Sequence, residues 1–235
     1  MEKIVYLPDS YQVNDSKRVI ADKLFTRAEC GLPEEGFVFC CFNNNYKIAA
    51  NLFEIWMRLL KAVERSILWL FEDNISATRN LRAEAQNRGI EPARLVFAKR
   101  MELSEHLARH RLADLFLDTL PYNAHTTASD ALWAGLPVLT CLGKTFPGRV
   151  AASLLNAVGL PELITQDLGA YEDLARELAT NPQHLRSLRQ QLAANSSTHP
   201  LFDTALFTKH IESAFVSMWK RRQAGLAPQH IYVKS

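Results

Sequence analysis

The sequence predicts an α/β protein built on a doubly wound, Rossmann-like parallel sheet. Between residues 37 and 158, short apolar runs alternate with longer segments whose apolar residues recur at helical spacing. The apolar runs are continuous and do not alternate with polar residues, which is typical of strands covered on both faces. Strands that alternate with helices pair in parallel through right-handed crossovers, so these two observations together predict a doubly wound sheet.

Five strands with intervening helices follow from this pattern. The first expected strand is the run FVFCCF at residues 37–42, which ends at three asparagines, and an amphipathic helix follows it over residues 48–63. From Tyr171 onward we expect only helices, the last around residues 207–222. The other expected strands are residues 66–71, 94–98, 113–118 and 137–140, and the other expected helices are residues 75–88, 102–111, 126–134 and 149–158.

Three regions are expected along the chain. Residues 1–31 do not fit the alternation of strands and helices, and the dipeptide Leu32-Pro33 marks a boundary. Residues 32–200 are expected to form the Rossmann-like lobe, and residues 201–235 a helical extension. No internal repeat is visible, which excludes a repeat array within this chain.

Composition excludes several classes of partner. The formal net charge is +2 and the basic residues are scattered, so we expect no nucleic-acid partner. The start of the chain carries charges at once, and no apolar stretch reaches the thickness of a bilayer, so we expect neither a signal peptide nor a membrane partner. The four cysteines lack metal-ligand and disulfide spacing, which favours buried thiols and a cytoplasmic location.

Two loops stand at the carboxyl ends of expected strands, where open parallel sheets bind ligands. The first, residues 43–47, contains three asparagines and Lys47, and the second spans residues 118–127. In the second loop, Thr126 and Thr127 stand at an expected helix N-terminus, whose N–H groups favour a phosphate. His125 is placed to hydrogen-bond a second phosphate oxygen, and Asp130 to accept from a ribose hydroxyl.

The same residues have a structural interpretation that pattern alone favours. Threonine is a common N-cap residue, so Thr126 could simply cap the expected helix, and Asp130 would complement the helix dipole. Lys47 stands at the start of an expected helix, the unfavourable end of the dipole unless an anion lies close, yet an isolated lysine is usually a solvated surface residue. His106 and Arg109 share one face of their expected helix, which alone would be unremarkable.

Motifs of other nucleotide and hydrolytic enzymes are missing. The sequence contains no GxGxxG or Walker motif, which argues against dinucleotide dehydrogenases and P-loop enzymes. It contains no GxSxG elbow, HExxH motif or His/Cys cluster, so we expect neither an α/β-hydrolase nor a tightly bound metal.

Several motifs together make the sequence specific. The segment LDTLPYNAHTTASDALWAG at residues 117–135 strongly resembles the nucleotide-sugar loop of the O-GlcNAc transferase and SPINDLY-like glycosyltransferase family, in its bacterial form. The segment FNNNYKI at residues 42–48 resembles that family's lysine motif, and residues 149–153 and 159–164 resemble its next segment. The resemblance runs from about residue 2 to the end, with the motifs in the same order.

The resemblance implies a GT-B fold, in which two Rossmann-like lobes flank the active site, and this chain would be the C-terminal lobe. It implies a UDP-sugar-dependent protein O-glycosyltransferase that is metal-independent, needs no cofactor, and transfers a sugar from a donor such as UDP-GlcNAc to a Ser or Thr hydroxyl. Lys47 would be the catalytic residue that neutralises the departing diphosphate. The other implied nucleotide-sugar-binding residues are Asn44, Met101, His106, Arg109, His125, Thr126, Thr127 and Asp130.

The sequence departs from the family pattern at two positions. Asn44 stands where animal members usually have glutamine, a mild change. Leu103 stands where they have a lysine near the base, which leaves the donor base open between UDP and the GDP of GDP-fucose, used by some SPINDLY-type members.

The resemblance also implies partners outside this sequence. In a full-length relative we expect an N-terminal catalytic lobe and tetratricopeptide repeats, so the isolated chain is expected to be inactive, with residues 1–15 as the end of the first lobe. Without that lobe, an apolar face of the last helix would be left exposed. Two alternatives stay open: a nucleotide-sugar-binding module without catalysis and a GDP-fucose-using transferase lobe; a sugar-nucleotide epimerase is disfavoured by the motifs. The candidate apolar residues are Phe207, Ile211, Phe215 and Trp219.

Overall fold

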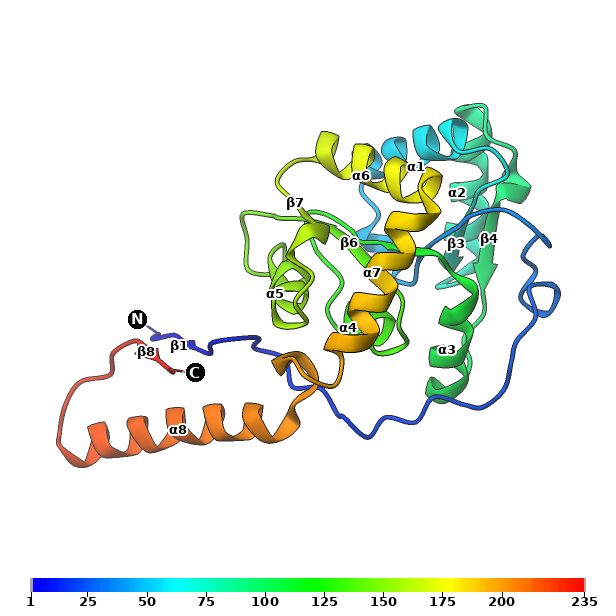
Figure 1. The fold of residues 1–235 in the computed structure, drawn as a ribbon. Coiled ribbons are helices and arrows are strands. Elements are labelled where there is room, and N and C mark those ends of the chain that lie inside the picture. Colours follow the sequence, from blue (N-terminus) through cyan, green and yellow to red (C-terminus); the bar gives the residue numbers. More distant parts are fainter. Residues whose placement is uncertain (1, 235) are drawn as a thin grey trace.

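A six-stranded parallel sheet forms the centre of the chain in the computed structural model, which describes residues 2–234 (Figure 1). The strand order is β4-β3-β2-β5-β6-β7, with β2 in the middle, so the chain winds outward first in one direction and then in the other. This is the order of a doubly wound Rossmann-like sheet, and the predicted fold class is confirmed. The strands are β2 (Val38–Cys41), β3 (Ile67–Phe71), β4 (Leu95–Ala98), β5 (Leu115–Leu117), β6 (Val138–Cys141) and β7 (Ile164–Thr165).

Helices cover both faces of this sheet. Helices α1, α2 and α6 lie along one face, and α3, α4 and α5 along the other (Figure 1). The α-helices are α1 (Ala50–Ala62), α2 (Ile75–Asn87), α3 (Leu103–Arg109), α4 (Thr126–Trp133), α5 (Val150–Ala157), α6 (Leu168–Thr180), α7 (Pro182–Asn195) and α8 (Thr204–Gln223). Short 3₁₀ turns lie at Ala28–Cys30, Asn45–Lys47, Pro92–Arg94, His110–Leu112, Pro161–Leu163 and Pro200–Phe202.

The continuous apolar runs are explained by coverage on both faces of the sheet. All four residues of β2 and all three of β5 are buried, so neither strand has a polar face. Helices α1 and α6 pack on each other above these strands, where Trp56 donates a hydrogen bond of 3.3 Å to the hydroxyl of Tyr171. Cys40 and Cys41 are part of this core, and no disulfide is present among residues 2–234. The same residues include no helix with the length and apolarity that crossing a bilayer requires.

Three short strands, β1, β7 and β8, were not predicted from the sequence. The expectation of only helices after Tyr171 is wrong, because β8 (Ile231–Tyr232) pairs in parallel with β1 (Val5–Tyr6). The rings of Tyr6 and Tyr232 stack with their centroids 4.6 Å apart. Together with β7, these strands are two residues long, too short to give a periodic pattern, and the β1–β8 pair joins the two ends of the described chain.

Residues 9–21, which we call the N-terminal strap, run in extended form along the side of the sheet lobe, beneath α4 and α3 in Figure 1. Hydrogen bonds fix the strap at several points. Asn14 donates through Nδ2 to the carbonyl of Leu201 at 3.1 Å, and Ala21 donates its N–H to the carbonyl of Ser104 at 3.0 Å. The strap is therefore fixed to α3, which follows β4, and to the 3₁₀ turn Pro200–Phe202 that precedes α8.

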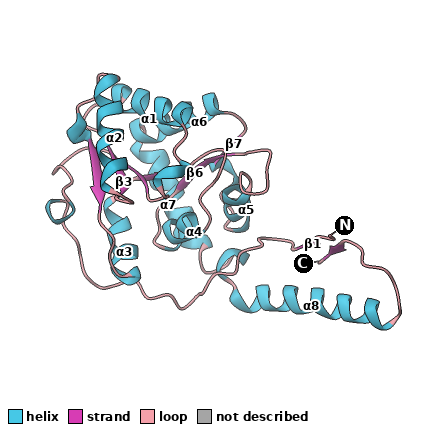
Figure 2. Ribbon diagram, turned by 180° about the vertical axis from the view of Figure 1, so that it is seen from behind, coloured by secondary structure: helices cyan, strands magenta, loops and turns pink. Residues whose placement is uncertain are grey.

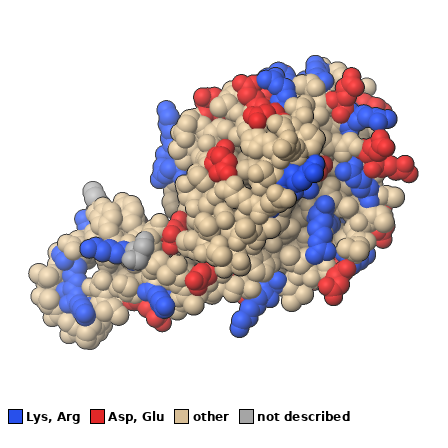
Figure 3. Space-filling view, viewed as in Figure 1, with Lys and Arg blue, Asp and Glu red and all other residues tan. Residues whose placement is uncertain are grey.

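Helix α8 projects away from the sheet lobe (Figures 1 and 2). Its outer half exposes the large apolar side chains Phe215 and Trp219, which are 58% and 62% accessible. Phe207 and Ile211, nearer the lobe, are half-buried, so the expected exposed face is present only in its outer part. The last turn of α8 carries Lys220, Arg221 and Arg222. Figure 3 shows blue side chains gathered on the part of the molecule that projects from the sheet lobe.

The exposed outer face of α8 is expected to promote self-association. Replacing both Phe215 and Trp219 by glutamate is expected to lower the fluorescence of an apolar-surface dye several-fold and to remove concentration-dependent association, because the largest apolar side chains leave the surface. Dye titration and sedimentation measure both effects. Ile75→Glu is the matched control, since Ile75 is an isolated, 81% exposed residue on α2. A monomeric parent chain that binds no dye would contradict this expectation.

Gly36 precedes β2 at a close approach of two backbones. Its φ is +108°, and a Cβ at this position would lie 2.0 Å from the carbonyl oxygen of Arg65. Gly36→Ala is therefore expected to destabilise the fold by at least about 2 kcal/mol. Gly89→Ala is the control, because Gly89 also has a positive φ, +73°, but open space around it, so about 1 kcal/mol is expected. Urea unfolding of both variants measures the difference, and equal losses would rule out the clash.

Candidate functional site

The loops that follow β2 and β5 meet where the winding direction of the sheet reverses. Strands β2 and β5 are neighbours, with Cys40 beside Phe116, yet α1 and α4 leave them toward opposite faces. Asn43 of the first loop donates to Thr119 Oγ1 of the second at 2.8 Å. The two loops singled out in the sequence therefore form one site at the topological switch point, the usual ligand position of such sheets.

Asp118 organises the second loop from beneath. Its side chain is buried at the end of β5, and Oδ1 accepts hydrogen bonds from the N–H groups of Thr119, at 2.7 Å, and Ala124, at 2.5 Å. Oδ2 accepts from the hydroxyl of Thr140 on β6 at 2.6 Å. One carboxylate thus ties both ends of the turn at residues 119–124 to the neighbouring strand. The position of Asp118 in the loop was predicted from the sequence, but this role was not.

Burial raises the pKa of Asp118 to about 7. Hydrogen bonds from Thr140, Ala124 and Thr119 and the positive charge of Lys47 oppose this rise, in that order. The carboxyl of Asp118 consequently changes charge near neutral pH.

Lys47 reaches across from the first loop to the second. It is half-buried, and its Nζ donates to the carbonyl of Asn123 at 3.0 Å and lies 4.2 Å from the ring centroid of Tyr122. Burial lowers the pKa of Lys47, and the charge of Asp118 opposes the change. The expectation that Lys47 opens a long helix is wrong, because it ends the 3₁₀ turn Asn45–Lys47 and α1 begins only at Ala50.

The N-terminus of α4 is left without a side-chain cap. His125 occupies the N-cap position, and its side chain accepts no hydrogen bond from the first turn. The alternative that Thr126 caps this helix is wrong, since Thr126 is already the first helical residue and its side chain is exposed. The first-turn N–H groups therefore face the site beside two threonines, a favourable environment for an anion. Thr127 donates its hydroxyl hydrogen bond to Asn43 Oδ1.

His125 is held by aromatic neighbours from two segments. Its Nδ1 shares a hydrogen bond of 2.8 Å with the hydroxyl of Tyr11 in the N-terminal strap, and its ring stacks on Tyr122 at 5.2 Å between centroids. Burial lowers the pKa of His125, and the charge of Lys47 adds to the effect, while a contact with the carbonyl of Pro147 opposes it. The imidazole is therefore mainly neutral at pH 7, and Tyr11 and Tyr122 fix its position beside the start of α4.

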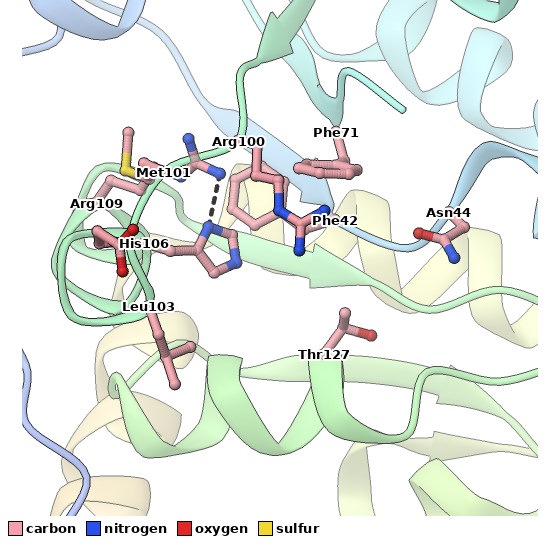
Figure 4. A pocket seen from close by; sticks show the side chains of 10 residues that line it. Phe42, Asn44, Phe71, Arg100, Met101, Leu103, His106, Arg109 and Thr127 are labelled. Atoms are coloured by element: carbon pink, nitrogen blue, oxygen red, sulfur yellow. Dashed lines mark hydrogen bonds between the residues drawn. The ribbon is translucent and has the colours of Figure 1, made fainter. Parts of the chain in front are cut away.

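A cavity of about 580 Å³ lies beside these loops (Figure 4). Its volume is within the range of small-molecule sites. Five of the nine predicted site residues line it, namely Asn44, Met101, His106, Arg109 and Thr127. The other lining residues are Phe42, Phe71, Arg100, Glu102 and Leu103. None of these was predicted as a site residue. Phe42 and Phe71 directly end the first two expected strands, and Arg100 follows the third, so position at a strand's carboxyl end is the signal that could have found these three.

His106 and Arg109 act as a pair on the wall of this cavity, as their helical spacing predicted. Arg109 donates through Nη2 to His106 Nδ1 at 2.6 Å and through Nη1 to the carbonyl of Lys99 at 2.7 Å (Figure 4). Burial lowers the pKa of His106 to about 2, with smaller contributions from His110 and Arg109. Burial also lowers the pKa of Arg109 to about 10. At neutral pH this wall therefore presents a neutral imidazole and a charged guanidinium.

Asp130 lies outside the cavity lining. It is buried beneath the N-terminal strap, where its Oδ1 accepts a hydrogen bond from Nη1 of Arg18. Burial raises the pKa of Asp130, and the charge and hydrogen bond of Arg18 oppose this rise. The sequence analysis assigned no role to Arg18, because a contact between residues so distant in the sequence leaves no local pattern.

No group of three or more His, Cys, Asp or Glu side chains suited to a metal ion occurs within the described range, residues 2–234. The groups that do converge on the switch point are Lys47 and the free N–H groups of α4, which can neutralise negative charge without an ion. Metal independence stays a prediction.

The fold and the position of the site define a lobe of the GT-B glycosyltransferase class. A family model described as glycosyl transferase family 41 matches residues 12–211. The chain therefore belongs to glycosyl transferase family 41.

Relatives from plants and a bacterium are similar over most of the chain. The probable UDP-N-acetylglucosamine–peptide N-acetylglucosaminyltransferase SEC of Arabidopsis thaliana is 39% identical over 238 residues, 99% of this chain and 24% of the relative. The probable enzyme of the same type named SPINDLY from Solanum lycopersicum is 35% identical over 85% of this chain and 22% of its own length. A solved variant of the Thermobaculum terrenum O-GlcNAc transferase superposes with a TM-score of 0.74 at 33% identity, covering 78% of this chain and 36% of that one.

The chain matches only one part of each of these longer proteins. The chain spans about a quarter or less of the length of the curated relatives it matches. The predicted resemblance to the O-GlcNAc transferase and SPINDLY-like family is confirmed, and the predicted assignments of individual site residues stay predictions.

Asp118 is expected to make stability depend on pH. Because its folded pKa, about 7, lies above the usual value near 4, the stabilisation from the protonated carboxyl is full below about pH 4 and is lost as pH rises through 7. Asparagine has no such ionisation. The free energy of unfolding of the parent chain minus that of Asp118→Asn is therefore expected to fall by roughly 1–3 kcal/mol between pH 5 and pH 8.

Urea unfolding at several pH values measures this difference, and other titrating groups cancel in it. Asp173→Asn is the matched control, because Asp173 is an exposed aspartate on α6. A difference between the parent chain and Asp118→Asn that stays constant with pH would show that the carboxyl titrates at its ordinary value.

Proposed function

We propose that the chain is the donor-nucleotide-binding lobe of a protein O-glycosyltransferase that uses a UDP-sugar such as UDP-GlcNAc. The observation that carries this proposal is the meeting of Lys47 with the uncapped N-terminus of α4 at the switch point. A cation and free backbone N–H groups on one spot suit a diphosphate. The neighbouring cavity, with aromatic and polar walls, suits the nucleoside attached to it.

Each site residue then has a role that fits its place. Lys47 with the first-turn N–H groups of α4 binds the diphosphate, assisted by the hydroxyls of Thr126 and Thr127 and by neutral His125. Asn44, Met101, His106 and Arg109 surround the nucleoside, with the backbone near Met101 facing the base. Asp130 accepts from a ribose hydroxyl.

The reaction that this site supports is a single inverting displacement. A Ser or Thr hydroxyl of a protein acceptor attacks the anomeric carbon as the bond from that carbon to the β-phosphate oxygen breaks. UDP leaves, and the hydroxyl proton is released to solvent. Lys47 and the α4 dipole stabilise the charge that develops on the departing diphosphate, so neither a metal nor another cofactor is required. Such a contact typically contributes roughly 10²–10³ in rate.

We expect the groups that bind the acceptor protein to lie in other parts of a full-length relative. We expect a second, N-terminal catalytic lobe to close the cleft over the donor, and tetratricopeptide repeats to bind the acceptor protein. The named relatives are peptide N-acetylglucosaminyltransferases, which supports a protein acceptor. This chain alone is therefore expected to bind the donor without turnover.

Lys47→Ala is expected to weaken binding of UDP by at least ten-fold, about 1.4 kcal/mol, because the diphosphate loses its cation. Isothermal titration calorimetry with UDP, UDP-GlcNAc and GDP-fucose measures this loss and identifies the base. Lys61→Ala is the matched control, since Lys61 lies at the exposed far end of α1.

Each outcome of this titration is informative. Binding of GDP-fucose in preference to UDP-GlcNAc would replace the UDP-sugar assignment with a SPINDLY-type donor. Leu103, which lines the cavity where animal members have a lysine, leaves the choice of base open. Equal binding by the parent chain and Lys47→Ala would remove Lys47 from the site. No binding of any nucleotide by a folded chain, shown by circular dichroism, would overturn the proposed function.

A further inference from the structure

The N-terminal strap reaches the candidate donor site through one ion pair. Arg18 donates through Nη1 to Asp130 Oδ1 in a short contact, and both side chains are nearly enclosed, at 13% and 8% exposure. A charge pair shielded from water is held more firmly than one on the surface. Arg18 is also the basic partner of the residue that the proposed function assigns to the ribose.

Helix α4 contacts Arg18 at several points. Nη2 of Arg18 lies 3.4 Å from Ser129 Oγ, and its guanidinium carbon lies 5.6 Å from the centre of the Trp133 ring. The indole Nε1–H of Trp133 donates to the carbonyl of Arg18 at 3.2 Å. Main chain and side chain of one strap residue are thus both fixed to α4, so the direction of the guanidinium is set by the fold.

A second strap residue secures the same turn of the helix. Ser129 donates its hydroxyl hydrogen bond to Asn14 Oδ1, and Asn14 in turn donates to Leu201 at 3.1 Å. The strap therefore clamps α4 at consecutive residues, Ser129 and Asp130. Asn14 holds the helix through a neutral contact, whereas Arg18 holds the carboxylate itself.

The ion pair leaves half of the carboxylate available. Among residues 2–234, the hydrogen bond from Arg18 to Oδ1 is the one that the Asp130 side chain receives, so Oδ2 has none. Burial favours the protonated carboxyl, and the positive charge of Arg18 acts against protonation. A carboxylate whose direction is fixed by a cation accepts strongly from a hydroxyl.

We infer that Arg18 is a positioning residue for recognition of the donor ribose, which orients Asp130 so that its second oxygen accepts from a ribose hydroxyl. The inference rests on the proposed function, because it needs a nucleotide at the switch point. It makes the N-terminal strap part of the donor site, although the sequence analysis placed residues 1–31 outside the nucleotide-binding lobe.

The test compares UDP with 2′,3′-dideoxy-UDP, which lacks both ribose hydroxyls and keeps the base and diphosphate. The parent chain is expected to bind UDP at least about ten-fold more tightly than the dideoxy analogue, as a hydrogen bond to a charged group implies. Arg18→Met keeps an apolar stem on Trp133 and removes the charge, and is expected to reduce this ratio to about three-fold or less. Arg18→Lys restores the charge and is expected to recover part of the ratio.

Two further variants separate positioning from a structural role. In an Asp130→Ala background, Arg18→Met is expected to change the ratio no further, because both substitutions remove the same contact. Arg58→Gln, which breaks the ion pair of Arg58 with Glu172 between α1 and α6, is the matched control and is expected to leave the ratio unchanged. Thermal unfolding of each variant identifies any that does not fold.

The outcomes distinguish the inference from the proposal beneath it. If Arg18→Met weakens UDP and its dideoxy analogue equally, Arg18 only supports the fold and the inference is overturned. If the parent chain binds UDP but does not discriminate against the analogue, the ribose contact and the inference fail while the donor-lobe function stands. If the folded parent chain binds neither, the proposed function fails first.

Discussion

The carboxylate of Asp118 is the interaction on which the candidate site depends. It is buried at the end of β5, where it accepts hydrogen bonds from two backbone N–H groups and one hydroxyl, and these bonds constrain the turn at residues 119–124. The conformation of this turn places the carbonyl of Asn123 under the Lys47 ammonium and presents the first turn of α4 to the same point. A loop held only by surface contacts would leave the position of these groups undetermined.

Two side chains, Lys47 and Arg109, supply positive charge near the switch point. Lys47 and Arg109 are cations in partly desolvated surroundings, whereas His106 and His125 are kept neutral by burial. Positive charge is therefore supplied by the lysine and the arginine, and the imidazoles contribute hydrogen bonds and ring contacts. The proximity of Asp118 to Lys47 limits the excess of positive charge at the site before any ligand binds.

The sheet and its helices could be predicted because each βα unit is a local pattern, strong in apolar periodicity and closed by residues nearby in sequence. The two functional loops followed from their position at strand ends, and Lys47 and Thr127 from residue type. The pair of Arg18 with Asp130 could not be found in this way, because it joins residues 112 positions apart and neither residue is unusual in its own segment. Helix capping was misjudged at Thr126 for a related reason, since a shift of one residue decides the cap.

The pairing of β1 with β8 joins segments 226 residues apart, a far longer loop than any crossover in the central sheet. Closing a loop costs conformational entropy that grows with its length, and two residue pairs return little enthalpy. We therefore expect the pair to form only after the sheet lobe and α8 are in place, and to open before them. Its backbone hydrogen bonds, donated by Ile231 and Val233, are expected to form a separate, weakly cooperative unit beside α8 that loosens without disturbing the switch point.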